Sequence, residues 1–400
     1  MSENDSTPNP SLWPGVLLWA SFAVIAVAVR GVRWDENYEF AQAMNPAFGY
    51  PETHPLFVYV RNAYNGQIYF SALAALIIDN AVLLNGMRNA AFVAATVLPP
   101  FLLGTVLARN TVAGHLCAVF VLYGIHLEFD GTYPQFVWPG MFSNGHIGTG
   151  FALAALALFA GNRIRTAAFM LGIMPLLHLG QAPPLFALAL VCGAAAMARK
   201  QFDTLRPGVP YVVAGLLVCL VFLVIQRTFG IDPAQSGPYS GELTSDEAWS
   251  GIVQHHDMHR RIPVGNSHLV PLMLVVVAIA GWRYSPLPGV AWSRVCSYAA
   301  IVGLIVYTTI ALQLGFGEQV PYVLVGWLPY RLANHLPIVL LALTVTVLLL
   351  EGNGATIPKW FLVGALMFLL VRPVLTGIMN ESTFQRYFSG TESIYFVLVG

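Results

Sequence analysis

Long apolar stretches separated by short polar connections run through almost the entire chain. The first stretch covers Leu12 to Val29 and is followed directly by arginine. The later stretches are Ile68–Leu84, Ala90–Ala108, Val112–Leu127, Ile147–Ala160, Ala167–Leu179, Leu185–Met197, Tyr211–Ile225, Leu269–Trp282, Val295–Leu314, Leu336–Leu350 and Trp360–Val371. A helix needs about 20 mainly apolar residues to cross the roughly 30 Å hydrocarbon layer of a bilayer. The pattern therefore predicts an all-α, polytopic integral membrane helical bundle with about 11–12 transmembrane helices.

The composition agrees with a membrane protein and excludes other classes. Of the 400 residues, 57% are hydrophobic and 10% are charged, and the mean hydropathy is +0.67. The formal net charge is zero, so we expect membrane lipids and not nucleic acid as partners. All four cysteines fall inside apolar stretches, where packed, reduced thiols are expected rather than disulfides or a zinc site.

No internal repeat or separate soluble segment divides the chain, so we expect one membrane domain over residues 1–400. The predicted segments outside the bilayer are a cytoplasmic tail (1–11), a first outer loop (30–67), a second outer loop (128–146), a large outer insert (226–267) and a C-terminal tail (379–400). The first tail lacks the basic residues that begin a secretory signal, so the first stretch is expected to stay as a signal-anchor helix. The sequence leaves the oligomeric state open.

The orientation follows from lysine and arginine in the short loops, which favour the cytoplasmic side. These basic residues share one side of the membrane if the segment 68–108 crosses the bilayer only once. Asp79 and Asn80 would then lie in an interfacial or re-entrant helix, because an ionised Asp at mid-bilayer is energetically costly. Two crossings would instead place the cluster around Lys200 outside, and we favour the single crossing. The residues concerned are Arg109, Arg163, Arg165, Arg199, Lys200, Arg206, Arg283, Arg294 and Lys359. Nine of the ten histidines then lie on or near the outer side.

Acidic residues concentrate in the first outer loop. They are Asp35, Glu36, Glu39 and Glu52, and the same loop carries His54. Carboxylates at a membrane surface can bind a divalent cation, act as a general base or simply be solvated. Asp130, in the second outer loop, could share a cation with the first loop, although Asp before Gly is also typical of a β-turn.

Three further clusters contain basic residues or histidine on the predicted outer side. The insert carries His255, His256, His259, Arg260 and Arg261. Their spacing suits phosphate or sugar binding, a metal site, or a solvated loop. Arg331 and His335 lie four residues apart before a late apolar stretch, where the arginine could contact phosphate or extend to the interface. His178 lies near Gln181 and is either a substrate ligand or a packed, hydrogen-bonded residue.

The triplet Trp34-Asp35-Glu36 just after the first apolar stretch resembles the first-loop acidic motif of the GT-C glycosyltransferases, which are membrane enzymes that use lipid-phosphate-linked sugars. Asp130 occupies the place of their second acidic residue, and the His-Pro-Leu step at His54 is similar to the step after their acidic motif. Arg331 stands where these enzymes hold the lipid phosphate. The chain departs from many members because it lacks a large C-terminal soluble domain and carries the insert 226–267.

This resemblance implies a GT-C-type glycosyltransferase that moves a sugar from a polyprenyl-phosphate donor to an acceptor on the outer face of a bacterial inner membrane. Asp35 would be the general base or a cation ligand, assisted by Glu36 and Asp130. A divalent cation, Mg²⁺ or Mn²⁺, would be held by Asp35 and Asp130. The alternatives are a transporter or flippase, or a polymerase, of a lipid-linked saccharide. A transporter is expected to show charged residues along an interior path on both sides of the membrane and often an internal repeat. Neither feature is evident in the sequence, so the enzyme is favoured.

Overall fold

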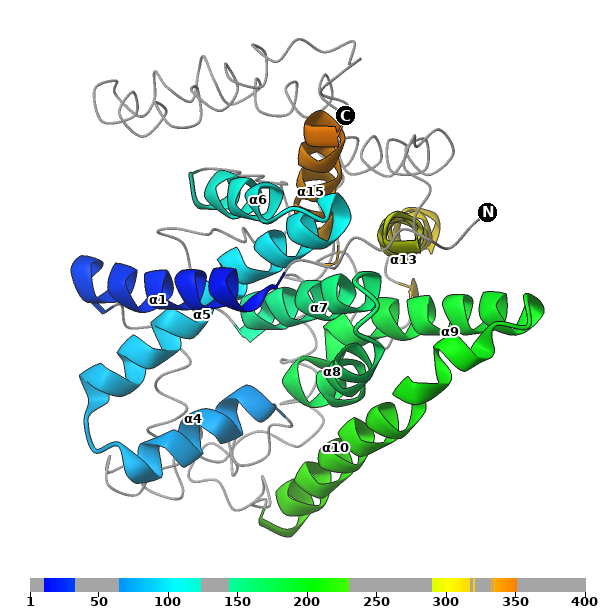
Figure 1. The fold of residues 1–400 in the computed structure, drawn as a ribbon. Coiled ribbons are helices and arrows are strands. Elements are labelled where there is room, and N and C mark those ends of the chain that lie inside the picture. The colour runs from blue at the N-terminus through cyan, green and yellow to red at the C-terminus, as the bar shows by residue number, and fades with distance from the viewer. Residues whose placement is uncertain are drawn as a thin grey trace.

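The computed structural model describes residues 11–32, 65–123, 144–229, 290–316, 319–320, 332 and 334–350. In these residues the regular structure is entirely helical (Figure 1). The α-helices are α1 (Trp13–Arg30), α4 (Gly66–Ile77), α5 (Ala81–Ala108), α6 (Thr111–Tyr123), α7 (Asn144–Ala160), α8 (Ile164–Leu177), α9 (Ala182–Ala198), α10 (Val209–Phe229), α13 (Val290–Phe316) and α15 (His335–Leu350). Three short 3₁₀ helices join them: η2 (Leu179–Gln181), η3 (Phe202–Thr204) and η4 (Arg206–Gly208).

Four segments of the described chain are long and apolar enough to cross a membrane. They are Ala81–Ala108, Leu179–Ala198, Phe202–Thr228 and Val290–Phe316. Several other apolar helical segments, including those of α1, α7 and α8, are shorter, with lengths of 10–17 residues. An all-helical, membrane-associated protein is thus what the structure supports, whereas the predicted total of about 11–12 crossings stays a prediction.

The break between α4 and α5 falls at Asp79 and Asn80, the polar pair that interrupts the predicted stretch Ile68–Leu84. Asp79 and Asn80 are exposed, and the Asn80 side chain caps α5 by accepting a hydrogen bond of 2.9 Å from the backbone N–H of Leu83. The 12 residues of α4 are fewer than the ~20 that a crossing requires, whereas α5 has 28. These lengths favour one crossing in the segment 68–108.

Helix α5 begins nine residues before the predicted stretch Ala90–Ala108. Polar residues such as Asn85 and Arg88 lower the hydropathy of its first turns, so the apolar pattern misses them. Both side chains are nevertheless buried, with exposed fractions of 0% and 9%. Tertiary packing therefore keeps this polar segment inside the helix, where hydropathy alone predicts an end.

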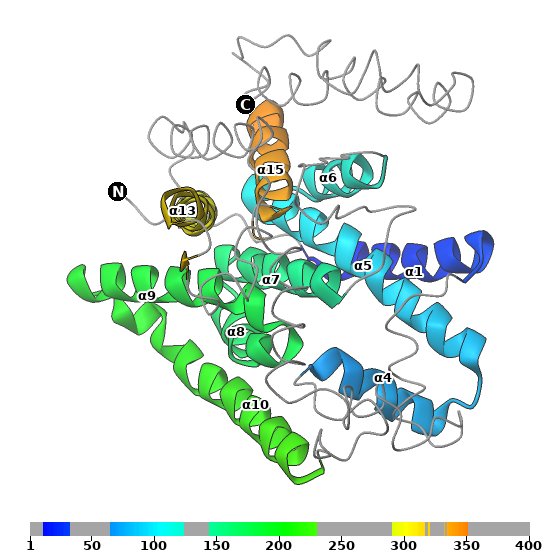
Figure 2. The same ribbon diagram turned by 180° about the vertical axis from the view of Figure 1, so that it is seen from behind.

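Two prolines inside α5 make room for α7. Pro99 has no N–H, so the carbonyl of Ala95 loses its hydrogen bond within the helix. At this point α7 approaches with Gly150, where a Cβ atom would lie 2.3 Å from the Ala95 oxygen. Glycine is required for this contact, which fixes how α7 lies against α5. Figures 1 and 2 both place α7 between α5 on one side and α8 and α9 on the other.

The connections that carry arginine and lysine lie close together. A Cβ atom at Gly161, after α7, would lie 3.1 Å from Val106, near the end of α5. A Cβ atom at Gly208, before α10, would lie 2.9 Å from Ile164, at the start of α8. Arg294 in α13 donates a hydrogen bond to the carbonyl of Phe159 in α7. This proximity is what the predicted one-sided distribution of the basic residues requires.

Candidate functional site

A row of buried polar side chains passes through the apolar interior, and we call it the polar cluster. Its members come from α5, α7, the α8–η2 junction, α13 and the start of α15. They are Thr96, His146, Thr149, Gln181, Tyr298, Asn334 and His335, which are buried, and His178, which is half-buried. Unpaired polar groups are costly inside a protein, so a buried polar cluster in a membrane protein marks a candidate functional site.

The cluster begins where α7 meets α5. His146 Nε2 and Thr96 Oγ1 lie 2.5 Å apart, and both side chains are buried. Because the single hydroxyl hydrogen of Thr96 is donated to the carbonyl of Phe92 at 3.0 Å, we assign Nε2 of His146 as the donor in this pair. Nδ1 of His146 then keeps its lone pair and has no hydrogen-bond partner in the part of the chain that the structure describes.

One turn further along α7, the cluster continues to the α8–η2 junction. Gln181 Nε2 donates to Thr149 Oγ1 at 3.2 Å, and the Gln181 side chain is 2% exposed. A Cβ atom at Gly148 would lie 2.6 Å from Cβ of His178, so the histidine side chain passes directly over this glycine. Only glycine at position 148 allows that approach, and it brings His178 against α7.

His335 at the start of α15 completes the cluster. Its Nδ1 atom lies 2.6 Å from the Tyr298 hydroxyl of α13, and both side chains are fully buried. Nε2 of His335 and Nδ2 of Asn334 have no hydrogen-bond partner among the described residues. His335 precedes the apolar stretch Leu336–Leu350. The imidazole therefore keeps one ring nitrogen available for hydrogen bonding.

A second buried polar group lies next to the cluster on α5. Asn85, Arg88 and Asn89 stand three and four residues apart, which places them on one face of the helix. The Arg88 guanidinium lies 5.4 Å from the Phe92 ring centre, and that ring is 6.3 Å from the His146 ring. A buried cation thus stands one aromatic ring away from the polar cluster.

Two of the predicted site residues, His178 and His335, are described, and the structure brings them together. The other predicted site residues lie outside the described residues. They are Asp35, Glu36, His54, Asp130, His255, His256, His259, Arg260, Arg261 and Arg331. Sequence reasoning missed Arg88, His146 and Tyr298. The spacing of Arg88 with Asn85 and Asn89 was a usable signal, whereas nothing in the sequence marks Tyr298, which is one aromatic residue within an apolar stretch.

The chemistry of the polar cluster suits hydroxyl groups better than a metal ion. No three His, Cys, Asp or Glu side chains in the described part of the chain lie close enough to hold a metal. The cluster offers imidazole, amide and hydroxyl groups, whereas Mg²⁺ and Mn²⁺ favour carboxylate ligands. It can donate and accept hydrogen bonds at once, which is what binding of a saccharide requires. The predicted cation ligands, Asp35 and Asp130, lie outside the described residues.

Comparison with known proteins adds no family. No protein-family model, no curated protein and no solved structure matches this chain.

Removing the hydroxyl of Tyr298 is expected to destabilise the protein by about 1–3 kcal/mol. In Tyr298→Phe the Nδ1 atom of buried His335 loses its partner, and desolvation of that atom is no longer offset. Thermal or denaturant unfolding in detergent measures the loss. Tyr211→Phe, at an exposed position on α10, is the matched control and should change little. An unchanged stability for Tyr298→Phe would contradict the assigned hydrogen bond.

Proposed function

We propose that the protein is a GT-C-like membrane glycosyltransferase that moves a sugar from a polyprenyl-phosphate donor to an acceptor at the outer face of a bacterial inner membrane. The observation that carries the proposal is the polar cluster. It places buried hydrogen-bonding groups, several of them without a described partner, within an otherwise apolar helical protein. A saccharide has many hydroxyl groups that can satisfy such groups.

Chain connectivity supports a link between the polar cluster and the predicted phosphate ligand. Arg331 is four residues from His335, and four residues of extended chain span at most about 14 Å. A guanidinium within this range of the cluster suits a donor whose sugar lies among buried hydroxyl-binding groups and whose phosphate lies at the rim. His146 likewise ends the predicted second outer loop, which carries Asp130.

The chemical step follows from the predicted roles. Asp35 accepts the proton of the acceptor hydroxyl, whose oxygen attacks the anomeric carbon of the donor sugar. The bond between that carbon and the phosphate oxygen breaks, and polyprenyl phosphate leaves with the electron pair. Arg331 stabilises the negative charge that develops on the phosphate. Glu36 and Asp130 assist by holding the acceptor or a divalent cation near the reacting atoms.

A transporter or flippase for a lipid-linked saccharide is the second candidate. The polar cluster favours it as well, because neutral imidazole and amide groups can bind a saccharide without reacting with it. The deciding experiment uses the purified protein in liposomes that contain a polyprenyl-phosphate-linked sugar. Transfer of the sugar to an added acceptor supports the enzyme. Movement of the lipid-linked sugar between leaflets without transfer would replace the enzyme by the transporter.

Replacing Arg331 with Ala is expected to weaken donor binding by about 1.5–3 kcal/mol, through loss of a charge-assisted contact with the lipid phosphate. Donor titration in nanodiscs measures this change. Arg206→Ala is the matched control, because Arg206 is exposed and already pairs with Asp203 at 3.9 Å. Equal donor affinity in the Arg331→Ala protein and the wild type would remove Arg331 from the site.

A further inference from the structure

An apolar cavity of about 170 Å³ lies among α7, α8, α9, the 3₁₀ helices η3 and η4, and the start of α10. Every side chain that lines it is apolar, including Phe159 of α7, Ile164 of α8 and Phe202 of η3. An apolar cavity of about this size in other proteins stays dry and binds small hydrocarbons. The lining therefore suits a hydrocarbon guest and not water or a polar metabolite.

Gly193 of α9 also lines the cavity. A Cβ atom there would meet no atom within 4 Å, so the space beside it is open. The glycine is not needed for a turn or a close helix contact, in contrast to the lining residue Gly208, where a Cβ atom would lie 2.9 Å from Ile164. A larger side chain at position 193 can thus occupy the cavity without displacing its walls.

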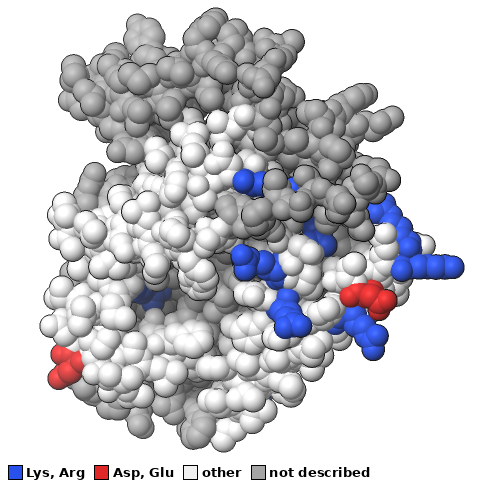
Figure 3. Space-filling view, viewed as in Figure 1, with Lys and Arg blue, Asp and Glu red and all other residues white. Residues whose placement is uncertain are grey.

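Four cations lie next to lining residues of this cavity in the chain. Arg163 and Arg165 flank the lining residue Ile164, and Arg199 and Lys200 precede Phe202. These four side chains are exposed and form no ion pair with any residue that the structure describes. Figure 3 shows most of the Lys and Arg side chains of this face from the centre to the right-hand side of the view, with a smaller blue patch on the left.

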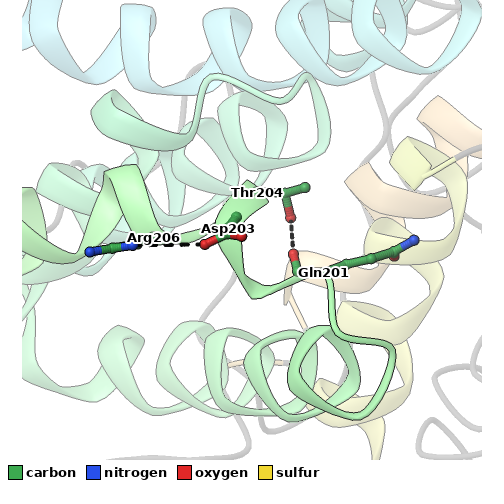
Figure 4. A network of polar contacts seen from close by, with 4 residues as sticks. All are labelled: Gln201, Asp203, Thr204 and Arg206. Carbon is green, nitrogen blue, oxygen red and sulfur yellow. Dashed lines mark hydrogen bonds and ion pairs between the residues drawn. The ribbon is translucent and has the colours of Figure 1, made fainter.

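The cavity wall itself is held by short-range contacts. Thr204 Oγ1 donates to the carbonyl of Gln201 at 2.8 Å, and Arg206 pairs with Asp203 (Figure 4). Arg294 stacks on the Phe159 ring at 4.1 Å and donates a hydrogen bond to the carbonyl of the same residue. Asp203 is the single carboxylate among residues 161–210, against five Lys and Arg residues, so the rim keeps an excess of positive charge.

We propose that this cavity binds a segment of one acyl chain of an anionic phospholipid, with the lipid phosphate held by the cations next to Ile164 and Phe202 in the chain. The neighbouring helices α9 and α10 expose apolar side chains such as Leu190 and Leu217, so the surface beside the cavity suits lipid tails. Basic pockets between membrane helices recognise anionic lipid head groups. A soluble anion would leave the apolar cavity unfilled, and a zwitterionic lipid would not match the excess of positive charge.

The test uses full-length protein in detergent and a phosphatidylglycerol with a photoreactive group in its acyl chain. We expect the label to map to residues that line the cavity, and to be displaced by unlabelled phosphatidylglycerol but not by glycerol 3-phosphate. Phosphatidylcholine with the same chains should displace it much less. In Gly193→Leu the labelling should fall at least about tenfold, the change expected when roughly two methylene groups lose their burial.

The matched control is Gly315→Leu on α13, where a Cβ atom also meets nothing within 4 Å, and its labelling should equal that of the wild type. An unchanged thermal midpoint shows that Gly193→Leu remains folded. Replacing both Arg163 and Arg165 with Gln should remove the preference for phosphatidylglycerol over phosphatidylcholine. Wild-type labelling of Gly193→Leu, displacement by glycerol 3-phosphate, or equal competition by phosphatidylcholine would each overturn the proposal. None of these results depends on sugar transfer.

Discussion

Replacing Asp35 with Asn is expected to lower the rate of sugar transfer at least about 100-fold, while donor binding changes little. Asparagine keeps the shape of the side chain but has neither the negative charge nor the basicity that accepts the proton of the acceptor hydroxyl. Positioned general bases contribute about 10²–10⁴-fold to a rate. The measurement is transfer from a polyprenyl-phosphate donor by purified protein in nanodiscs, alongside donor titration of the same preparation.

Asp79→Asn provides the matched control for this experiment. It makes the same chemical change at an exposed carboxylate between α4 and α5, a residue that is not part of the predicted first outer loop, so transfer should proceed as in the wild type. Transfer at the wild-type rate by Asp35→Asn would remove Asp35 from catalysis. A fall in donor binding as large as the fall in rate would instead assign Asp35 to binding.

Replacing Gly172 with Leu is expected to destabilise the protein by about 3 kcal/mol, the upper part of the range for overpacked interiors. Helices α8 and α10 touch through Gly172 and Gly215. A Cβ atom at position 172 would lie 2.4 Å from the backbone oxygen of Val212 and 2.9 Å from Cα of Gly215. Backbone atoms cannot rotate away as a side chain can, so the helices must separate. Close approach through small residues is a common basis of helix association in membranes.

Unfolding in detergent measures this loss, and Cys219 supplies a local readout. Its thiol is buried and donates to the carbonyl of Gly172 at 3.3 Å. In a protein that keeps only this cysteine, Gly172→Leu should increase the reaction with a thiol reagent. Gly193→Leu makes the same substitution where the space is open and should leave stability and thiol reaction unchanged. Equal stability of the Gly172→Leu protein and the wild type would contradict the contact between α8 and α10.

Helix positions are the part of the fold that the sequence predicts best. The stretch Leu12–Val29 corresponds to α1, Ile147–Ala160 to α7, and Val295–Leu314 to α13, with differences of a few residues at the ends. These stretches are recognisable because a helix in a membrane is apolar on all sides. Helix α5 is the exception, since its first turns carry the polar face of Asn85, Arg88 and Asn89.

The candidate site is predicted only in part. His178 and His335 stand out in the sequence because they are polar residues at the ends of apolar stretches. Other members of the polar cluster do not stand out, since Thr96 and Tyr298 are single residues within apolar stretches. Thr96 joins the cluster through His146, and Tyr298 joins it through His335, both of them far away in the chain. The separation of 37 residues between Tyr298 and His335 leaves no local pattern to detect.

The sequence by itself determined that the chain is helical and apolar enough to cross a membrane, where most of its helices lie and which short connections carry the positive charge. Each of these properties depends on residues that are neighbours in the chain. Only the tertiary structure decided that Gly148 brings His178 against α7, that Gly172 and Gly215 join α8 to α10, and that an apolar cavity opens beside Gly193. Such features depend on distances between separate helices. A glycine that permits a close contact and one that faces open space are identical in sequence.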